Sequence, residues 1–424
     1  MKRNKPMFVD LFSGCGGLSL GMLQAGWGGL FAIEKTDDAF LTLESNLLSE
    51  SKLNRPDKIR FNWPDWLPKS AYSVEDFLNK YGKQLKAERD KIDLVVGGPP
   101  CQGYSSAGRR IASDPRNSLF KQYIKFVGIA NPALILVENV KGMSSKFHSN
   151  GKGKHEPPHS ELLAQALKKN GYSIVQQSLI QSSKFGVPQN RLRYITFAAR
   201  SDLPLNGIDF FHLLEESRSK FLEDLGLGNT PVTVKQAISD LCIENQKLQP
   251  CLDPESVSGF QELVYKKPKT AYQKLMHGKM NGGQINSLRL PQHRSETIEK
   301  FKAILESCNR GEQVRGTQLN AKVKEKLSIG KRTTIPLSKD APAPTITTLP
   351  DDMIHYNEAR IHTVREHARM QSFPDWFEFR GTYTTGGKRR RIQCPRYTQV
   401  GNAVPPLLAK AMGHVLLDII KRLK

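Results

Sequence analysis

The chain has 424 residues, of which 38% are hydrophobic and 25% are charged, with 33 glycines and 25 prolines. This composition excludes a collagen-like or low-complexity chain, and the length indicates two domains or one elaborated domain. Lys and Arg exceed Asp and Glu by 22 charges. This excess of positive charge favours a polyanionic partner, either nucleic acid or an acidic membrane surface. The alternative is a basic surface with no partner.

The six cysteines form no CxxC pair, and no histidine stands at the short spacing that a zinc site uses. The basic N-terminus lacks the continuous apolar core of a signal peptide. Apolar runs also stay well below the length of about 20 residues that spans a bilayer. The sequence therefore predicts a reduced, cytoplasmic protein without a metal and without a membrane partner.

Short apolar runs alternate with helix-like stretches in the first half of the chain, which is the pattern of an open, largely parallel α/β sheet. The predicted strands are Met7–Phe12, Leu30–Ile33, Ile92–Val96, Ala133–Val137 and Tyr194–Ala199. Helices are predicted for Leu18–Ala25, after a glycine turn, and for Leu407–Arg422 near the C-terminus.

The alternation of predicted strands and helices ends near residue 201, and a regular helical pattern appears again only near the C-terminus. We therefore expect a second domain that is inserted into the first. Its predicted range is 201–394, and the sheet domain comprises residues 1–200 and 395–424.

A glycine-rich turn, DLFSGCGG, follows the first predicted strand and contains Gly14 and Gly16. Such a turn lets the backbone approach a ligand at a helix N-terminus. The GxGxxG fingerprint is broken at Ser19, which disfavours a nicotinamide dinucleotide. Glu34 lies twenty positions after Gly14, where it suits the ribose hydroxyls of a nucleoside. These facts favour a nucleoside cofactor without a pyrophosphate, commonly S-adenosylmethionine, over a tight turn beside a surface glutamate.

A second loop, GGPPCQGYSSAGRR, presents Cys101 just beyond the predicted strand Ile92–Val96. The two prolines keep its backbone extended. A lone cysteine is more often buried and inert, but basic neighbours lower the pKa of a thiol and favour the thiolate. The side chains that we expect to close on a phosphate backbone are those of Gln102, Ser105, Arg109, Arg110 and Arg116.

Six motifs in the chain resemble, in order, those of the DNA (cytosine-5) methyltransferases of bacterial restriction-modification systems. They are DLFSGCGG, GGPPCQGYS, ENV, QNRLR, RIHTVREHARMQSFPD and QVGNAVPP. Residues 201–340 lack a match, and the family carries its variable target-recognition region there, before a hinge-side motif at about 341–376. The resemblance implies an α/β fold: a Rossmann-like, S-adenosylmethionine-dependent methyltransferase sheet with an inserted, smaller target-recognition domain.

The resemblance also implies a role for each motif residue. Cys101 would add to ring carbon six of cytosine, so that carbon five can attack the methyl sulfonium of S-adenosylmethionine. Glu138 would supply a proton at ring nitrogen three, and Arg193 would contact Glu138 and the flipped base. Arg191, on the same strand face, either joins this site or holds the sheet together. The residues implied to contact the cofactor are Phe12, Gly14, Gly16, Glu34, Leu119, Asn402 and Val404.

The implied reaction is methylation of a cytosine that is flipped out of a specific double-stranded DNA sequence. The alternatives are a transfer-RNA cytosine-5 methyltransferase with the same motifs and a catalytically silent DNA-binding protein. The variable region favours DNA, because sequence readout in the major groove needs additional elements. The implied partners are duplex DNA and a cognate restriction endonuclease, and we expect a monomer without a metal ion.

Two residues depart from the family pattern. Ser73 stands where the family usually has an acid for the adenine amino group, and Lys35 stands where an aromatic residue often packs on adenine. A basic insertion, Thr384–Arg396, is either an extra phosphate contact or a solvated loop. The residues interpreted as structural supports of the recognition domain are Arg360, Thr363, Arg365, Glu366 and Arg369.

Overall fold

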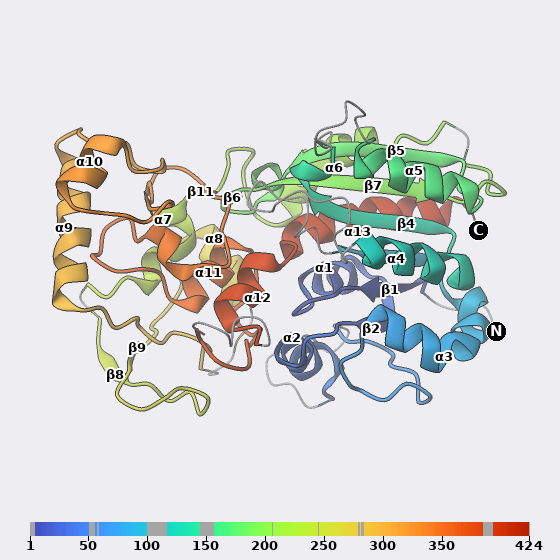
Figure 1. Cartoon of the computed structure of the whole chain (residues 1–424), viewed down its shortest axis with the longest axis horizontal. Coiled ribbons are helices and arrows are strands. Elements are labelled where there is room, and N and C mark those ends of the chain that lie inside the picture. Colours follow the sequence, from blue (N-terminus) through green and yellow to red (C-terminus); the bar gives the residue numbers. More distant parts are fainter. Residues whose placement is uncertain are drawn as a thin grey trace, which may run out of the picture.

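The computed structural model describes residues 5–50, 56, 59–99, 117–144, 157–205, 207–244, 246–278, 280, 284–384 and 393–423. These residues form two lobes (Figure 1). The sheet lobe is built on a six-stranded sheet with helices on both faces. The second lobe consists of helices, two-stranded ribbons and loops.

The sheet has the strand order β2-β1-β3-β4-β7-β5. Its strands are β1 Met7–Leu11, β2 Gly28–Ile33, β3 Leu94–Gly97, β4 Leu134–Val140, β5 Ile174–Gln181 and β7 Leu192–Ala199. The first four in this order pair in parallel, whereas β7 runs antiparallel to both β4 and β5. The predicted strands are confirmed with small shifts at their ends, and the sheet is mixed.

The strand β5 was absent from the sequence prediction. It lies at the edge of the sheet, and its side chains are only half-buried or exposed. An edge strand of this kind carries polar residues on both faces. The sequence IVQQSLIQ therefore lacks the continuous apolar run that marks the central strands.

Successive residues of β1 point to opposite faces of the sheet and enter different cores. Phe8 packs in the cluster that contains α1 Gly17–Ala25 and α13 Pro406–Lys421, while Val9 packs in the cluster of the other face. The helices on that other face are α3 Val74–Glu88, α4 Asn117–Ala130 and α5 His159–Lys169. A further helix, α2 Asp37–Leu43, follows β2.

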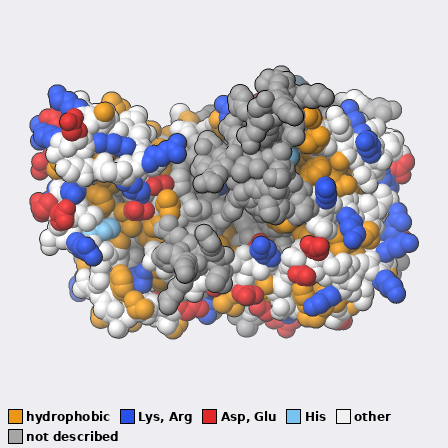
Figure 2. Space-filling model, viewed as in Figure 1, with side chains coloured by type: hydrophobic (Ala, Val, Ile, Leu, Met, Phe, Trp, Pro, Cys, Tyr) orange, Lys and Arg blue, Asp and Glu red, His pale blue; other side chains and the backbone are white. Residues whose placement is uncertain are grey.

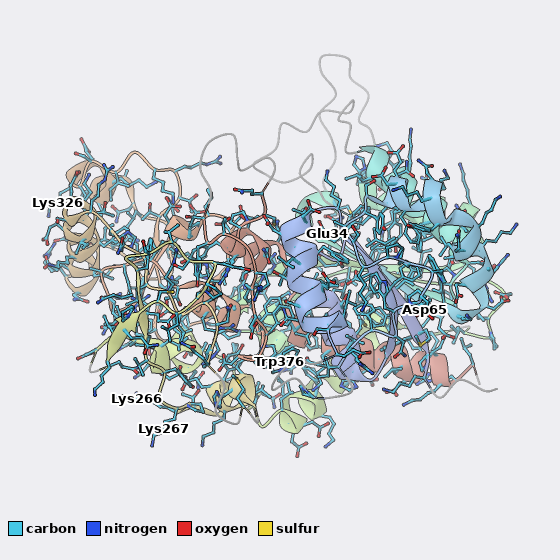
Figure 3. The ribbon with its side chains drawn as sticks, turned by 90° about the horizontal axis from the view of Figure 1, so that it is seen from below. Glu34, Asp65, Lys266, Lys267, Lys326 and Trp376 are labelled. Carbon is cyan, nitrogen blue, oxygen red and sulfur yellow. The ribbon has the colours of Figure 1, made fainter. Side chains whose placement is uncertain are left out.

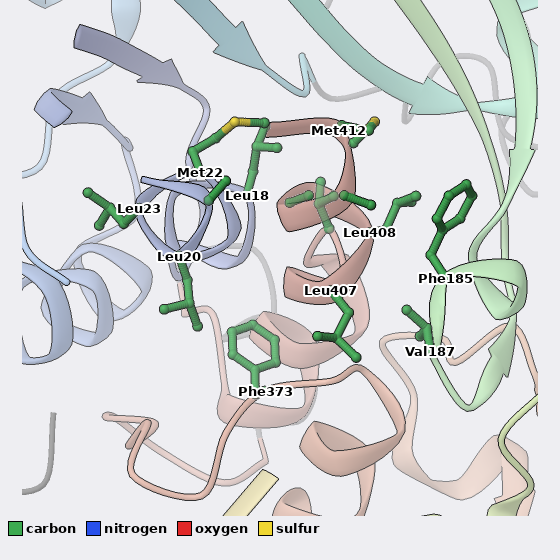
Figure 4. Packing of buried hydrophobic residues seen from close by; sticks show 14 of the residues in the cluster. Leu18, Leu20, Met22, Leu23, Phe185, Val187, Phe373, Leu407, Leu408 and Met412 are labelled. Carbon is green, nitrogen blue, oxygen red and sulfur yellow. The ribbon is translucent and has the colours of Figure 1, made fainter. Parts of the chain in front are cut away.

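The last helix returns the C-terminus to the sheet lobe and packs against α1 (Figure 4). Leu18 and Met22 of α1 face Leu408 and Met412 of α13. Residues 396–421 are long and apolar enough to cross a membrane by length and composition, but most of this stretch is buried inside the protein. The apolar character of this stretch is therefore explained by its place in the core.

The second lobe follows α6 Phe210–Asp224. Its helices are α7 Val234–Ile238, α8 Ala271–His277, α9 Ser295–Asn309, α10 Ala321–Lys326 and α11 Val364–Met370. Its ribbons are β8 Leu248–Pro250 with β9 Gln261–Leu263, and β10 Ile335–Pro336 with β12 Met353–Ile354. A short pair, β6 Gln189–Asn190 with β11 Ala343–Pro344, joins this lobe to the sheet lobe.

The helix α6 belongs in space to the sheet lobe, although it follows residue 201. It packs against α13, and the Phe210 ring stacks on that of Phe197 in β7 with 4.9 Å between centroids. This part of the predicted inserted domain therefore lies beside the sheet.

The hinge-side motif is held by buried polar contacts. Thr363 and Glu366 form a capping box at the start of α11, and Arg360 binds the Glu366 carboxylate at 2.7 and 2.8 Å. Arg369 binds Asp375 at 2.6 and 2.7 Å. The Arg365 guanidinium donates to three backbone carbonyls. These contacts confirm the structural interpretation of the motif.

Candidate cofactor and base-binding site

The turn between β1 and α1 consists largely of left-handed backbone. Phe12, Gly14 and Gly16 have φ values of 59°, 54° and 93°. Such a conformation costs a residue with a Cβ about 1–2 kcal/mol, and backbone strain of this kind gathers at ligand sites. A Cβ at Gly17 would lie 2.4 Å from the carbonyl oxygen of Val404. The turn and the QVGNAVPP segment are therefore in close contact.

Glu34 supports this turn from the end of β2. Its carboxylate accepts the amide of Gly14 at 3.0 Å and that of Thr36 at 2.8 Å. Each carboxylate oxygen keeps a further lone pair, and the side chain is only partly buried. Figure 3 shows Glu34 near the region where the two lobes meet, whereas Lys326 lies at the far end of the second lobe. Glu34 thus combines a structural role with spare capacity to accept hydrogen bonds.

The other residues expected at the cofactor differ in their positions. Val404 is buried beside the glycine turn. Asn402 is the exposed last residue of α12 Arg396–Asn402, and Leu119 is half-buried in the first turn of α4. The structure therefore gathers Gly14, Gly16, Glu34 and Val404 around one turn.

Of the two residues that depart from the family pattern, Ser73 has a structural role and Lys35 lies at the surface. Ser73 caps α3, because its hydroxyl accepts the amide of Asp76 at 3.0 Å and donates to the Asp76 carboxylate at 2.6 Å. Lys35 is exposed to solvent. Neither side chain supplies the acid or the aromatic ring of the family pattern.

Glu138 and Arg193 form a buried ion pair between the neighbouring strands β4 and β7. The Arg193 Nε atom lies 2.6 Å from Glu138 Oε1, and the two side chains are 7% and 12% exposed. Burial lowers the pKa of Arg193, while the charge of Glu138 opposes this effect. The pair places a carboxylate and a guanidinium at the carboxyl end of β4, where α/β sheets bind their ligands.

The start of the cysteine loop lies against this ion pair. A Cβ at Gly98 would stand 3.0 Å from Glu138 Oε2, and the Asn139 amide donates to the carbonyl of Pro99 at 3.4 Å. The GGPP and ENV motifs are thus neighbours in space. Cys101 itself lies outside the described residues, as do Gln102, Ser105, Arg109, Arg110 and Arg116.

Arg191 is engaged by backbone groups instead of by the ion pair. Its guanidinium donates to the carbonyls of Ile346 at 3.0 Å and Gly401 at 2.8 Å. Burial lowers its pKa, and the nearby charge of Arg193 lowers it further. These contacts hold two distant segments beside β7 and do not join strands of the sheet to one another.

The insertion Thr384–Arg396 is described only at its two ends. Arg396 is fully buried and pairs with Asp253 and Glu255 of the second lobe. Its guanidinium also lies over the Tyr383 ring, 4.3 Å from the centroid. Arg396 is therefore a structural residue, and it is available neither to a phosphate nor to solvent.

Sequence reasoning missed two buried polar residues near the site. Asp10 of β1 is 1% exposed, and the Ser19 hydroxyl donates to it at 2.5 Å. Gln371 is fully buried directly after α11. Asp10 could have been noticed as a single acid inside the apolar run MFVDLF, and Gln371 as a polar residue of the motif RIHTVREHARMQSFPD.

The fold is shared with solved methyltransferase structures. A DNA modification methyltransferase encoded within an Escherichia coli prophage aligns with a TM-score of 0.64 and 22% identity, covering 98% of this chain and all of the other. The Dnmt2 methyltransferase of S. pombe aligns with a TM-score of 0.50 and 15% identity over 99% of this chain. These similarities establish the methyltransferase fold of the chain.

Similarity of sequence extends over nearly the whole chain. The type II methyltransferase M.DdeI of Desulfomicrobium norvegicum is 30% identical over 416 residues, which cover 96% of this chain and 87% of M.DdeI. The type II methyltransferase M.AgeI of Thalassovita gelatinovora is also 30% identical, covering 96% of this chain and 98% of M.AgeI. The model of the C-5 cytosine-specific DNA methylases matches residues 6–418. The chain therefore belongs to the family of C-5 cytosine-specific DNA methylases.

Proposed function

We propose that this DNA (cytosine-5) methyltransferase transfers a methyl group from S-adenosylmethionine to a cytosine that is flipped out of a specific duplex sequence. The observation that carries the proposal is the buried Glu138–Arg193 pair, with Gly98 of the cysteine loop beside its carboxylate. Three motifs that are far apart in the sequence thereby meet at one point. In the proposal, the flipped base binds at this point, between the nucleophile Cys101 and the proton donor Glu138.

In the proposed mechanism the Cys101 thiolate forms a bond to ring carbon six, and the ring electrons move toward carbon five and nitrogen three. When the base binds, Glu138 takes a proton from solvent and delivers it to nitrogen three, and Arg193 stabilises the carboxylate that is left behind. Bound S-adenosylmethionine supplies an electrophilic methyl group, whose bonding electrons remain on the sulfur. The proton on nitrogen three then returns to the Glu138 carboxylate, and loss of the carbon-five proton to solvent expels Cys101 as a thiolate and restores the aromatic ring.

The residues around the glycine turn fit S-adenosylmethionine. Apart from Gly14 and its two chain neighbours, no described residue has an atom within 4 Å of the point where a Cβ of Gly14 would be, so a ligand can approach this backbone. Glu34 has free lone pairs for ribose hydroxyls. In this proposal the cofactor is held by Phe12, Gly14, Gly16, Glu34, Leu119, Asn402 and Val404.

We further propose that the loop residues Gln102, Ser105, Arg109, Arg110 and Arg116 contact DNA, and that the second lobe reads the target sequence. The excess of 22 positive charges supports a phosphate-bearing partner, and Figure 2 shows Lys and Arg side chains over both lobes. The relatives M.DdeI and M.AgeI are type II methyltransferases. The proposal is therefore a cytoplasmic, monomeric, protective methylase with a cognate endonuclease.

The test is bisulfite sequencing of DNA from a bacterium without cytosine methylation that expresses this protein, with Cys101→Ala as the matched variant. We expect protected cytosines in one short sequence with the wild type and none with Cys101→Ala, because the nucleophile is lost. Full protection by Cys101→Ala would contradict the mechanism. Unprotected DNA together with methylated transfer RNA would favour the transfer-RNA alternative.

A further inference from the structure

Two fully buried glutamines, Gln189 and Gln371, bind each other where the two lobes meet. Gln189 Nε2 donates to Gln371 Oε1 at 2.6 Å. Gln371 Nε2 donates to the carbonyls of Val400 at 2.8 Å and Ala403 at 3.0 Å. Gln189 Oε1 accepts the amide of Ile346 at 2.9 Å. The two side-chain amides therefore connect four separate stretches of backbone.

These stretches belong to three parts of the molecule. Val400 and Ala403 lie in the QVGNAVPP segment, which contacts the glycine turn through Val404. Gln189 begins β6, which leads directly into β7 and Arg193. Ile346 and Gln371 belong to the second lobe. The glutamine pair is thus hydrogen-bonded to the segment that contacts the glycine turn and to the second lobe, and Gln189 itself lies on the segment that leads to Arg193.

The surroundings leave these groups little freedom to move independently. Arg191 bonds to the carbonyls of Gly401 and Ile346, which are the same two segments. A Cβ at Gly401 would lie 2.4 Å from the carbonyl oxygen of Thr347. A buried polar group that loses its partner costs about 1–3 kcal/mol. A shift of α11 therefore either breaks these bonds at that cost or carries residues 400–403 with it.

We propose that Gln371 and Gln189 are positioning residues that couple DNA binding by the second lobe to cofactor binding at the glycine turn. The inference rests on the proposed function, because it takes residues 402 and 404 as cofactor contacts and the second lobe as the DNA reader. Coupling of this kind is reciprocal. DNA that tightens cofactor binding must itself bind more tightly when the cofactor is present.

The test measures binding of S-adenosylhomocysteine by calorimetry, alone and with a duplex that contains the target site mapped by bisulfite sequencing. The variants are Gln371→Met and Gln189→Met. The matched control is Gln273→Met, because Gln273 is equally buried but forms its hydrogen bonds within the second lobe. Its Oε1 accepts the backbone amide of Lys269 at 2.8 Å, and its Nε2 donates to the Ser239 hydroxyl at 3.0 Å. The ratio of the two affinities isolates coupling from any general loss of binding.

We expect the duplex to tighten binding about ten-fold in the wild type and in the control, and less than about two-fold in the two variants. Wild-type coupling in Gln371→Met and Gln189→Met would overturn the inference, as would the absence of coupling in the wild type. Wild-type protein that binds no S-adenosylhomocysteine would instead refute the proposed function. Thermal unfolding identifies folded variants, and the isosteric Gln371→Glu, which lacks both donors, replaces Gln371→Met if the latter does not fold.

Discussion

Asp10 shows how one residue can depend on the fold around it. It lies inside β1, next to the glycine turn, with Ser19 as its hydrogen-bond donor. Burial raises its pKa from 3.8 to about 7, Ser19 opposes this shift, and the charge of Glu34 adds to it. The folded protein therefore holds a proton on Asp10 in a pH range in which the unfolded chain releases it.

This shift predicts a pH-dependent stability. The folded pKa lies above the unfolded pKa, so the contribution of Asp10 is present at low pH and is lost as the pH rises toward 7. We expect Asp10→Asn, which cannot ionise, to gain stability relative to the wild type by about 2–3 kcal/mol between about pH 5 and about pH 8. Denaturant unfolding at several pH values measures this difference, and a constant difference would argue against the shift.

Glu138 is the second residue whose role can be tested alone. We expect Glu138→Gln to lower kcat by about 10²–10⁴-fold, the usual contribution of a general acid. Binding of S-adenosylhomocysteine should stay unchanged, because Glu138 pairs with Arg193 and is not among the residues proposed to hold the cofactor. Single-turnover methylation and calorimetry give the two quantities. A variant with wild-type kcat would remove Glu138 from the mechanism.

At the scale of elements, the packing of α1 on α13 sets the position of the glycine turn. The two helices approach closely at Gly21, where a Cβ would lie 2.3 Å from the Cβ of Ala409 and 2.5 Å from the carbonyl oxygen of Pro406. A Cβ at Gly413 would likewise lie 2.7 Å from that of Ala25. Glycines at these positions let the C-terminal helix dock on the helix that follows the turn.

This close approach predicts opposite effects of one substitution at two helical glycines. We expect Gly21→Ala to lower the free energy of unfolding by about 1–3 kcal/mol, because it overpacks the interface. Gly82→Ala on α3, where nothing lies within 4 Å of the added Cβ, should raise it by about 0.4–1 kcal/mol. Chemical unfolding of both variants provides the comparison. Equal effects at the two sites would contradict the close packing of α1 on α13 at Gly21.

For the helix α11, the sequence predicts the contacts at the helix start but not the contacts with distant parts of the chain. The pattern of Thr363 and Glu366, three residues apart, is a sequence signature of a helix start, and the capping box is present. The partners of Arg369, by contrast, are Asp375 and the distant Asp240. No local pattern could have identified Asp240, because only the folded chain brings it to α11.

At the scale of the whole molecule, the excess of positive charge dominates the expected behaviour toward DNA. Each phosphate that is neutralised releases condensed counterions, so affinity falls as salt rises. We expect the affinity for duplex DNA to fall about 10³-fold between about 50 mM and about 200 mM salt. Fluorescence anisotropy over this range measures the slope, and an affinity that stays constant would exclude phosphate contacts as the main source of binding.

The sequence by itself determined the central strands, the glycine turn, the last helix and the order of the family motifs. These features are local, since they depend on continuous apolar runs, on glycine and proline, and on spacing along the chain. Only the tertiary structure decided that β5 forms the sheet edge, that α6 lies on the sheet lobe, and that Glu138 pairs with Arg193 beside Gly98. It also decided that Gln189 and Gln371 join the two lobes. These features depend on contacts between residues far apart in the chain, and the partner of a buried polar group is fixed by the packing of whole elements.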